Sequence, residues 1–275
     1  PPMVNVHLCQ PDATKSCAAC CGIYNYVENT RPALMRRFEY RGLLMAGVRA
    51  GTLSLDEYRS AVRHREDGKR IFKTIYSCEF AGFVDDSRQR VGCMLHPMVT
   101  GGCDLRDNSF YGRDICDGHF CPSYQKLTEN EALCVLAAVD DWYLYGSVIT
   151  DIDFVKAFFR FTQNSLGEEI SPEVVKASPA LTGIMREYFS LKTTWPFRDV
   201  SKPRFGKYYF VGEEYAIDRI DYEKLGAAVP EYDPVFLSLS SCFIAKDELD
   251  RATGTIDNLF KGFCHEYDPS HREHH

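Results

Sequence analysis

Apolar residues recur along much of the chain at the three-to-four-residue spacing of amphipathic helices. Residues 31–50 predict one such helix, and Ser54 can cap a second helix that has acidic residues in its first turn. The apolar positions of the first helix are Leu34, Phe38, Leu43, Leu44 and Val48. Residues 71–84 are instead rich in β-branched and aromatic side chains, and this composition predicts an extended segment.

The second half of the chain carries stronger helix signals. Thr128 begins a capping box ahead of an apolar run over residues 133–145, which predicts a helix there. Thr150 can cap the next helix, and Gly167 is placed to end it.

The same signals continue to the end of the chain. Ser171 and Ser178 each precede a proline, a pairing typical of helix starts. Residues 206–212 predict a short strand, and the stretch 234–267 is expected to be largely helical. Its apolar stripe consists of Leu249, Ala252, Ile256, Leu259, Phe260 and Phe263.

One segment, residues 86–126, lacks this periodicity and is rich in Gly, Asp and Cys. Such a segment cannot easily build its own apolar core, so we expect a metal to cross-link it. We therefore divide the chain into a cysteine-rich metal-binding region, residues 1–126, and a mainly helical region, residues 127–275. The predicted fold class is mainly α (α+β with minor β), with the first region packed on the second.

The net charge of −7 is unevenly spread. Residues 1–126 carry 17 Lys/Arg and 14 Asp/Glu (+3), whereas residues 127–275 carry 15 and 25 (−10). This balance argues against nucleic-acid binding, so we expect a protein partner or substrate instead. The arginines Arg31, Arg36, Arg37 and Arg41 are predicted to form a solvated helix face.

Two further features bear on location. No run of about 18 apolar residues occurs, so we expect no membrane span. The first residues lack the charged-then-apolar pattern of a signal peptide, and we expect a cytoplasmic protein.

The placement of the twelve cysteines is the most informative feature of the sequence. Nine of them lie at Cys9, Cys17, Cys20, Cys21, Cys78, Cys93, Cys103, Cys116 and Cys121. The other three, Cys134, Cys242 and Cys264, follow apolar patterns and are expected to be packing residues. Clustering in one half of a chain with ample apolar residues favours a metal site over disulfides, although a disulfide-rich secreted protein is an alternative.

Cys17 and Cys20 form a C-x-x-C knuckle, whose spacing lets two thiolates reach one metal ion from a tight turn. The adjacent Cys21 binds the same centre, serves a second centre or packs as an apolar residue. A closed site needs about four ligands, and the cysteines that can supply the rest are Cys78, Cys93, Cys116 and Cys121.

The run Ser16–Gly22 resembles the core of the CxxCxxCC family of zinc- or iron-chelating domains. The segments Cys78–Phe83 and Gly92–Pro97 are similar to two later motifs of that family. The resemblance covers roughly residues 9–126 and implies a metal-binding function. Because the family is related to flagellin lysine N-methylase, it also implies a protein (lysine) methyltransferase-like enzyme as an alternative.

The chain departs from the family pattern in two places. The first cysteine of the pattern would fall at position 14, where this chain has Thr14, and Cys9 lies further upstream. The long stretch between Cys93 and Cys116 leaves the choice among Cys103, Cys116 and Cys121 open.

The donor set suits two kinds of metal centre. A [4Fe–4S] cluster takes four thiolates, and Cys121-Pro122 is similar to the Cys-Pro that ends bacterial ferredoxin motifs, so we favour iron–sulfur. Zinc is the alternative, for which imidazole is also a suitable ligand. His96 and His119 could supply it, but we expect them to lie around the site or at the surface. Nine early cysteines exceed the need of one site, so either two centres or several spectator thiols are expected. The terminal His271, His274 and His275 are expected to be solvated.

Overall fold

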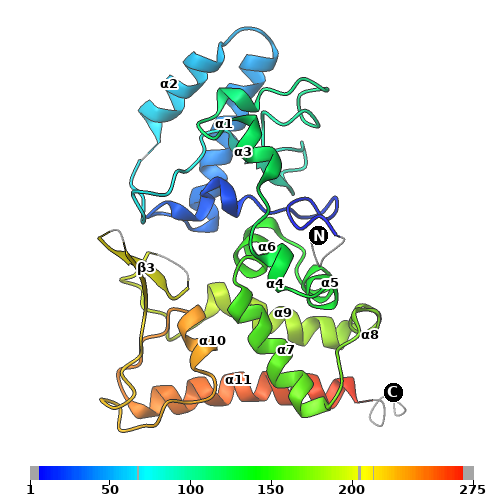
Figure 1. Cartoon of the computed structure of the whole chain (residues 1–275), viewed down its shortest axis with the longest axis vertical. Coiled ribbons are helices and arrows are strands. Elements are labelled where there is room, and N and C mark those ends of the chain that lie inside the picture. The colour runs from blue at the N-terminus through cyan, green and yellow to red at the C-terminus, as the bar shows by residue number, and fades with distance from the viewer. Residues whose placement is uncertain (1–5, 67, 204–205, 213, 269–275) are drawn as a thin grey trace. The chain divides into compact units, whose positions relative to one another are not determined.

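The computed structural model describes residues 6–66, 68–203, 206–212 and 214–268 of the chain (Figure 1). The protein is mainly helical, and its described strands form two small antiparallel sheets of two strands each. This is the predicted fold class. No helix in the described part of the chain is both long and apolar enough to cross a membrane.

The chain divides into two compact units. We call the first the cysteine unit, which is formed by His7–Cys121 together with Asp141–Gly146. The second, the helical unit, is formed from residues between Pro122 and Asp140 and from Ser147 onward. The boundary expected after residue 126 therefore lies inside the helical unit, at the end of a short helix.

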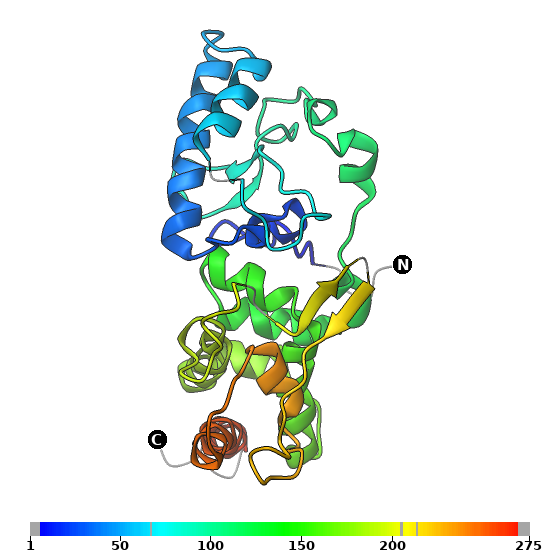
Figure 2. The same ribbon diagram turned by 90° about the vertical axis from the view of Figure 1, so that its left-hand side faces the viewer.

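The cysteine unit contains two long helices, α1 (Arg31–Arg49) and α2 (Leu55–Arg65), and one short helix, α3 (Gly112–Gly118). Its strands are β1 (Ala81–Phe83) and β2 (Val91–Cys93). The single-turn elements are η1 (Ala19–Cys21), η2 (Ile23–Asn25) and η3 (Arg106–Asn108). Helices α1 and α2 lie side by side, as Figure 2 shows at one edge of this unit.

The helical unit holds the remaining elements. These are α4 (Ser123–Lys126), α5 (Glu129–Ala138), α7 (Ile152–Leu166), α8 (Pro172–Ala177), α9 (Pro179–Thr194), β3 (Tyr208–Val211), β4 (Glu214–Ile217), α10 (Asp233–Ser238) and α11 (Lys246–Tyr267). Helix α6 (Trp142–Ile149) begins in the cysteine unit and ends in the helical unit.

Five helix ends lie where the capping residues predict them. Ser54 and Thr128 each make both hydrogen bonds of a capping box, at the starts of α2 and α5. Ser171 and Ser178 cap α8 and α9 through their hydroxyls. Gly167 ends α7 with a φ of 73°, a left-handed conformation that glycine adopts without steric cost.

Two predicted elements differ from the structure. Residues 71–80 form turns rather than a strand, because the Asn25 side-chain amide donates to the carbonyls of Phe72 and Ile75 and accepts from the Phe72 amide. The helix expected over residues 133–145 is broken after Ala138. The carboxylate of Asp141 accepts the Tyr143 amide at 2.8 Å and so begins a separate helix, α6.

The helical unit is built around aromatic side chains. The predicted stripe of α11 is buried along its whole length, and its Phe260 and Phe263 pack against Phe158 of α7 at ring-centroid distances of 5.6 and 5.0 Å. Thr150 does not cap α7, since the carboxylate of Asp151 accepts the Phe154 amide instead.

The cysteine unit has two apolar clusters, and they fix the loops that carry its cysteines. One cluster includes Phe38 of α1 and Phe83 of β1, which contact the Trp142 ring at 5.5 and 6.0 Å between centroids. The other surrounds Phe80 and contains the buried Cys78. Because Cys21 packs against both clusters, the first cysteine-bearing turn is held at their junction.

Candidate metal centre

A tight loop brings Cys9 next to Cys17. The carboxylate of Asp12 accepts hydrogen bonds from the amides of Thr14 and Lys15 and thereby turns the chain back on itself. The Cys17 amide then donates to the Cys9 carbonyl at 2.8 Å. Thr14 contributes to this turn, and Cys9 is the cysteine whose backbone is bonded to the C-x-x-C segment.

The C-x-x-C segment forms a tight turn. The Ala19 amide points at the Cys17 sulfur at 3.5 Å, and the single turn η1 follows. The turn closes through a 2.8 Å bond from the Gly22 amide to the Ala19 carbonyl. Amide donors of this kind stabilise a thiolate or a metal-bound sulfur.

Cys121, the last residue of the segment His7–Cys121, lies next to this turn. The thiols of Cys20 and Cys121 are hydrogen-bonded to each other, and this bond, together with burial, raises the pKa of Cys20. Burial and the neighbouring Cys9 thiol raise the pKa of Cys17. Cys9, Cys17, Cys20 and Cys121 are thus one set of neighbouring thiols, which we call the Cys20 group.

Cys21 faces a different set of residues. The Cys78 amide donates to the Cys21 carbonyl at 2.8 Å, so the two cysteines are joined through their backbones. Gly22 permits this approach: its φ is 74°, and a Cβ there would lie 2.3 Å from the Tyr76 carbonyl oxygen. Only glycine fits this position without displacing the backbone of residues 76–78.

The β1–β2 hairpin adds Cys93 to the same set. Ala81, which is paired with Cys93 across the hairpin, also donates its amide to the Cys78 carbonyl at 3.3 Å. Cys93 and Cys21 both pack against the apolar cluster that contains Cys78. Burial raises the pKa of Cys93 from 9.0 to about 12, and the Cys78 and Cys116 thiols add to the rise.

Cys116 completes this set from α3. Its thiol is hydrogen-bonded to Ser109, and burial raises its pKa. Burial also raises the pKa of Cys21, and the thiols that contribute most after it are Cys78, Cys93 and Cys116 in that order. We call Cys21, Cys78, Cys93 and Cys116 the Cys21 group.

The basic residue nearest to Cys78 was missed by the sequence reasoning. Arg41 is buried rather than solvated, with 1% of its side chain exposed. Its guanidinium donates to the carbonyls of Cys78 and Ala81 at 3.0 and 2.7 Å and forms an ion pair with Glu66. A sequence signal for this existed, because Arg41 shares the face of Leu34, Phe38 and Met45 at helical spacing.

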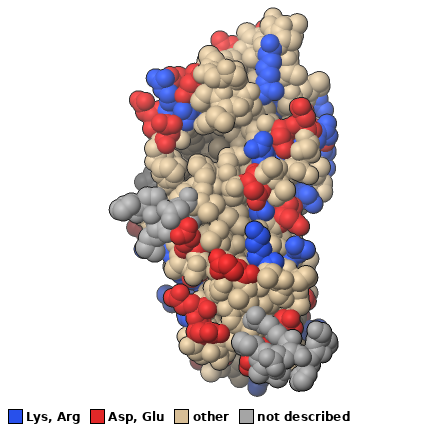
Figure 3. Space-filling view, turned by 90° about the vertical axis from the view of Figure 1, so that its right-hand side faces the viewer, with Lys and Arg blue, Asp and Glu red and all other residues tan. Residues whose placement is uncertain are grey.

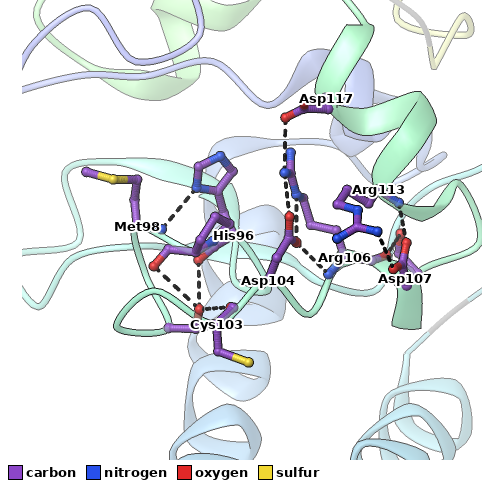
Figure 4. Close-up of polar contacts among 11 residues, drawn as sticks. His96, Met98, Cys103, Asp104, Arg106, Asp107, Arg113 and Asp117 are labelled. Carbon is purple, nitrogen blue, oxygen red and sulfur yellow. Dashed lines mark hydrogen bonds and ion pairs between the residues drawn. The ribbon is translucent and has the colours of Figure 1, made fainter.

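A second buried arginine orders the segment that carries Cys116. Arg106 pairs with Asp104 at 2.6 Å and with Asp117 of α3 at 3.0 Å, as Figure 4 shows. Its hydrogen bonds hold the pKa of Asp104 at about 2. The positive charge of Arg106 also acts to lower the pKa of Cys93 and of Cys116, against the larger effect of burial.

The other candidates lie outside both groups. Cys103 is exposed, and its carbonyl accepts from the Thr100 hydroxyl (Figure 4). His96 accepts the Met98 amide on Nδ1 at 3.2 Å, which makes it part of a turn. His119 is exposed, and His271, His274 and His275 lie outside the described residues.

The three late cysteines behave differently from one another. Cys134 is fully buried in α5, as predicted for a packing thiol. Cys264 is half-buried, with its sulfur 3.6 Å from the Thr162 carbonyl oxygen. Cys242 is exposed, contrary to prediction, because α10 ends at Ser238 and leaves Cys242 in an irregular segment.

Each group offers four sulfurs, a donor set that fits a tetrahedral zinc ion or a [4Fe–4S] cluster. Within the described ranges, no group of three or more His, Cys, Asp or Glu side chains is already arranged so that it could hold a metal ion. Binding would therefore require the thiols of a group to converge further. All twelve cysteines lie in the described part of the chain, and none is joined in a disulfide.

Comparison of the chain with protein-family models, with curated proteins and with solved structures gives no match.

Proposed function

We propose that this protein binds metal through its clustered cysteines, with a [4Fe–4S] cluster on the Cys20 group and another on the Cys21 group. The observation that carries the proposal is that eight cysteines fall into two sets of four neighbouring residues, which are joined by backbone hydrogen bonds and by mutual effects on their pKa values. In each set the cysteines come from segments far apart in the sequence, and sequence-distant thiols gather in this way at metal centres. The resemblance of residues 9–126 to zinc- or iron-chelating domains supports the same function.

The thiols in each set raise one another's pKa, and this supports a bound cation. Four thiolates in one buried set would repel one another, and a metal or cluster removes this penalty while it deprotonates its ligands. The four-sulfur donor set alone does not distinguish zinc from iron–sulfur. Cys121 followed by Pro122 supports iron–sulfur, as in ferredoxin motifs. Such clusters supply one-electron transfer, which is the chemistry proposed for this chain.

The surface charge supports a protein as partner or substrate. Figure 3 shows small groups of basic and acidic side chains alternating on one face of the molecule. A nucleic-acid interface would need a broad basic stripe to neutralise phosphates. We therefore propose a protein partner, not nucleic acid.

Metal and sulfide analysis of the full chain, purified without oxygen, tests the proposal. We expect about eight irons per chain and absorbance near 400 nm, since each cubane cluster holds four irons. Cys17→Ser and Cys93→Ser should each lose about half of this iron, whereas the matched control Cys103→Ser should lose none. Stoichiometric zinc without iron would establish the zinc alternative, and a chain that binds neither metal would refute the proposal.

A further inference from the structure

The hairpin of β3 and β4, yellow in Figure 2, presents an apolar face to solvent. Tyr208 is paired with Ile217 across the hairpin, and Tyr215 lies two residues before Ile217, so the three side chains share one face. The rings of Tyr208 and Tyr215 pack with 5.6 Å between centroids. The exposed fractions are 44% for Tyr208, 66% for Tyr215 and 51% for Ile217. Exposed apolar side chains gathered in this way mark an interaction surface.

The opposite face of β4 is acidic. Glu214 and, just past the end of the strand, Asp218 occupy the positions that alternate with the apolar ones. Glu214 is exposed, and Asp218 forms an ion pair with Lys202 at 3.0 Å. Over residues 214–223 the chain carries four Asp/Glu and one Lys/Arg, a net charge of −3. A partner that lies along β4 therefore meets negative charge on this face.

The outer edge of β4 is placed to receive a further strand. Among the described residues this sheet has only two strands, and a hairpin of two strands is marginally stable on its own. The Asp218 amide donates to the Lys207 carbonyl at 2.8 Å, so the backbone groups of Tyr215 and Ile217 alternate with it and point away from β3. Lys207, at the start of β3, pairs with Asp153 of α7 at 2.6 Å. Since β3 holds the hairpin to the helical unit, β4 provides the open edge.

We propose that β4 binds an extended segment of a partner protein, which adds to the sheet as a third strand and alternates apolar with basic residues. Its apolar side chains extend the face of Tyr208, Tyr215 and Ile217, and its basic side chains meet Glu214 and Asp218. In this mode of recognition, main-chain hydrogen bonds supply affinity and the alternating side chains supply specificity.

Charge selects this occupant over a second copy of the chain. Residues 122–140 and 147–275 carry 16 Lys/Arg and 24 Asp/Glu (−8), so the whole helical unit attracts a basic segment. Pairing of β4 with β4 of a second copy would put the carboxylates of both copies on one face, where they repel. The inference specifies the protein partner of the proposed function and rests on that partner, not on a bound metal.

The test uses a short, fluorescently labelled peptide of alternating Lys and Val, titrated with the full chain and followed by anisotropy. We expect saturable binding that weakens with added salt. The same peptide with Glu in place of Lys should not bind. A Lys-Val peptide whose alternate amides are N-methylated should also lose binding, because a third strand needs those amides as hydrogen-bond donors.

Variants of the chain locate the surface. Ile217→Thr keeps a β-branched residue in the strand but removes apolar surface, and should weaken binding about five- to tenfold. Val229→Thr is the matched control, because Val229 is exposed but lies outside the hairpin, and it should bind as wild type does. Glu214→Gln should weaken binding about two- to fivefold. Circular dichroism verifies that each variant is folded.

The comparison of peptides needs no variant, so a variant that fails to fold does not obscure the outcome. Absence of binding by the Lys-Val peptide, or equal binding of the acidic or N-methylated peptide, would overturn the inference. A chain that dimerises, and that Ile217→Thr makes monomeric, would overturn it in favour of a second copy as the occupant. Peptide binding by a chain shown to hold no metal would support this inference while it refutes the proposed metal centres.

Discussion

The guanidinium of Arg41 donates a 3.0 Å hydrogen bond to the Cys78 carbonyl, while its Nε lies 2.7 Å from Oε1 of Glu66. A buried cation on α1 therefore holds the backbone of a candidate metal ligand. Arg41→Ala would leave Glu66 buried without this partner and the Cys78 carbonyl without a donor.

We expect Arg41→Ala to lower the free energy of unfolding by about 3–5 kcal/mol, the usual cost of breaking a buried ion pair. Arg36→Ala is the matched control on the same helix, because Arg36 has 65% of its side chain exposed and contacts Glu28 at the surface. It should cost less than about 1 kcal/mol. Urea denaturation of both variants measures the difference, and equal costs would contradict the role of Arg41.

Gly22 is predicted to be irreplaceable at the junction of Cys21 and Cys78. Gly22→Ala imposes the left-handed conformation on alanine, at roughly 1–2 kcal/mol, and also drives its Cβ into the Tyr76 carbonyl. Gly51→Ala is the control, since Gly51 has a φ of 70° but open space around it. Gly22→Ala should lose more stability and about half of the metal. If both variants keep full metal content, the close approach does not matter for binding.

The Asp104–Arg106 pair gives a pH-dependent contribution to stability. The pKa of Asp104 is lowered from 3.8 to about 2 by its hydrogen bonds with Arg106. The pair therefore stabilises the fold fully above pH 3.8, and this contribution is lost as the pH falls towards 2. Asp104→Asn should lower the melting temperature at pH 6 but not when the pH is lowered to about 2.

The exposed Asp86 serves as the control for this substitution. Asp86→Asn should leave the melting temperature unchanged at both pH values. A loss in Asp104→Asn that persists unchanged in acid would rule out the ion pair as its cause.

Metal removal should act on one part of the chain. Residues 85–123 have little regular structure apart from β2, η3 and the short α3, so we expect chelation to make them protease-sensitive. The long helices α7 and α11, which bury an aromatic core, should survive with most of the helical circular dichroism. Limited proteolysis with and without chelator decides this, and equal protection in both states would show that packing alone orders the segment.

Cys134 is predicted not to be a ligand, because it is fully buried among the apolar residues of the helical unit. Cys134→Ala should cost roughly 0.5–3 kcal/mol in thermal or urea unfolding and leave the metal content unchanged. Loss of metal in this variant would contradict the assignment.

Local sequence signals predicted the parts of the fold that local physics decides. The capping boxes at Ser54 and Thr128 and the stripe on α11 depend on residues within a few turns of one another, and all three were predicted. The break between α5 and α6 was missed because apolar residues lie on both sides of Asp140 and Asp141, so the two aspartates were placed inside one helix. The Asp141 carboxylate in fact begins the second helix.

The candidate site was predictable only in part for the same reason. The C-x-x-C spacing indicates that Cys17 and Cys20 lie together, but it does not assign their neighbour Cys21. That assignment depends on the hydrogen bond between Cys21 and Cys78, residues far apart in the sequence. The apolar spacing of α1 is consistent with a buried Arg41, but that pattern does not reveal its partner Glu66, which lies outside the helix.

The insertion of Asp141–Gly146 into the cysteine unit constrains how the protein can be made. All candidate ligands have left the ribosome once Cys121 emerges, but the core beneath them still lacks Trp142, which packs on Phe38. Tyr145, which donates to the Leu8 carbonyl at 2.8 Å, emerges later still. In a nascent chain, all candidate cysteine ligands are therefore outside the ribosome before the residues that bury them. We expect the cofactor to bind after residue 146 has emerged, when the cysteine unit can complete its core.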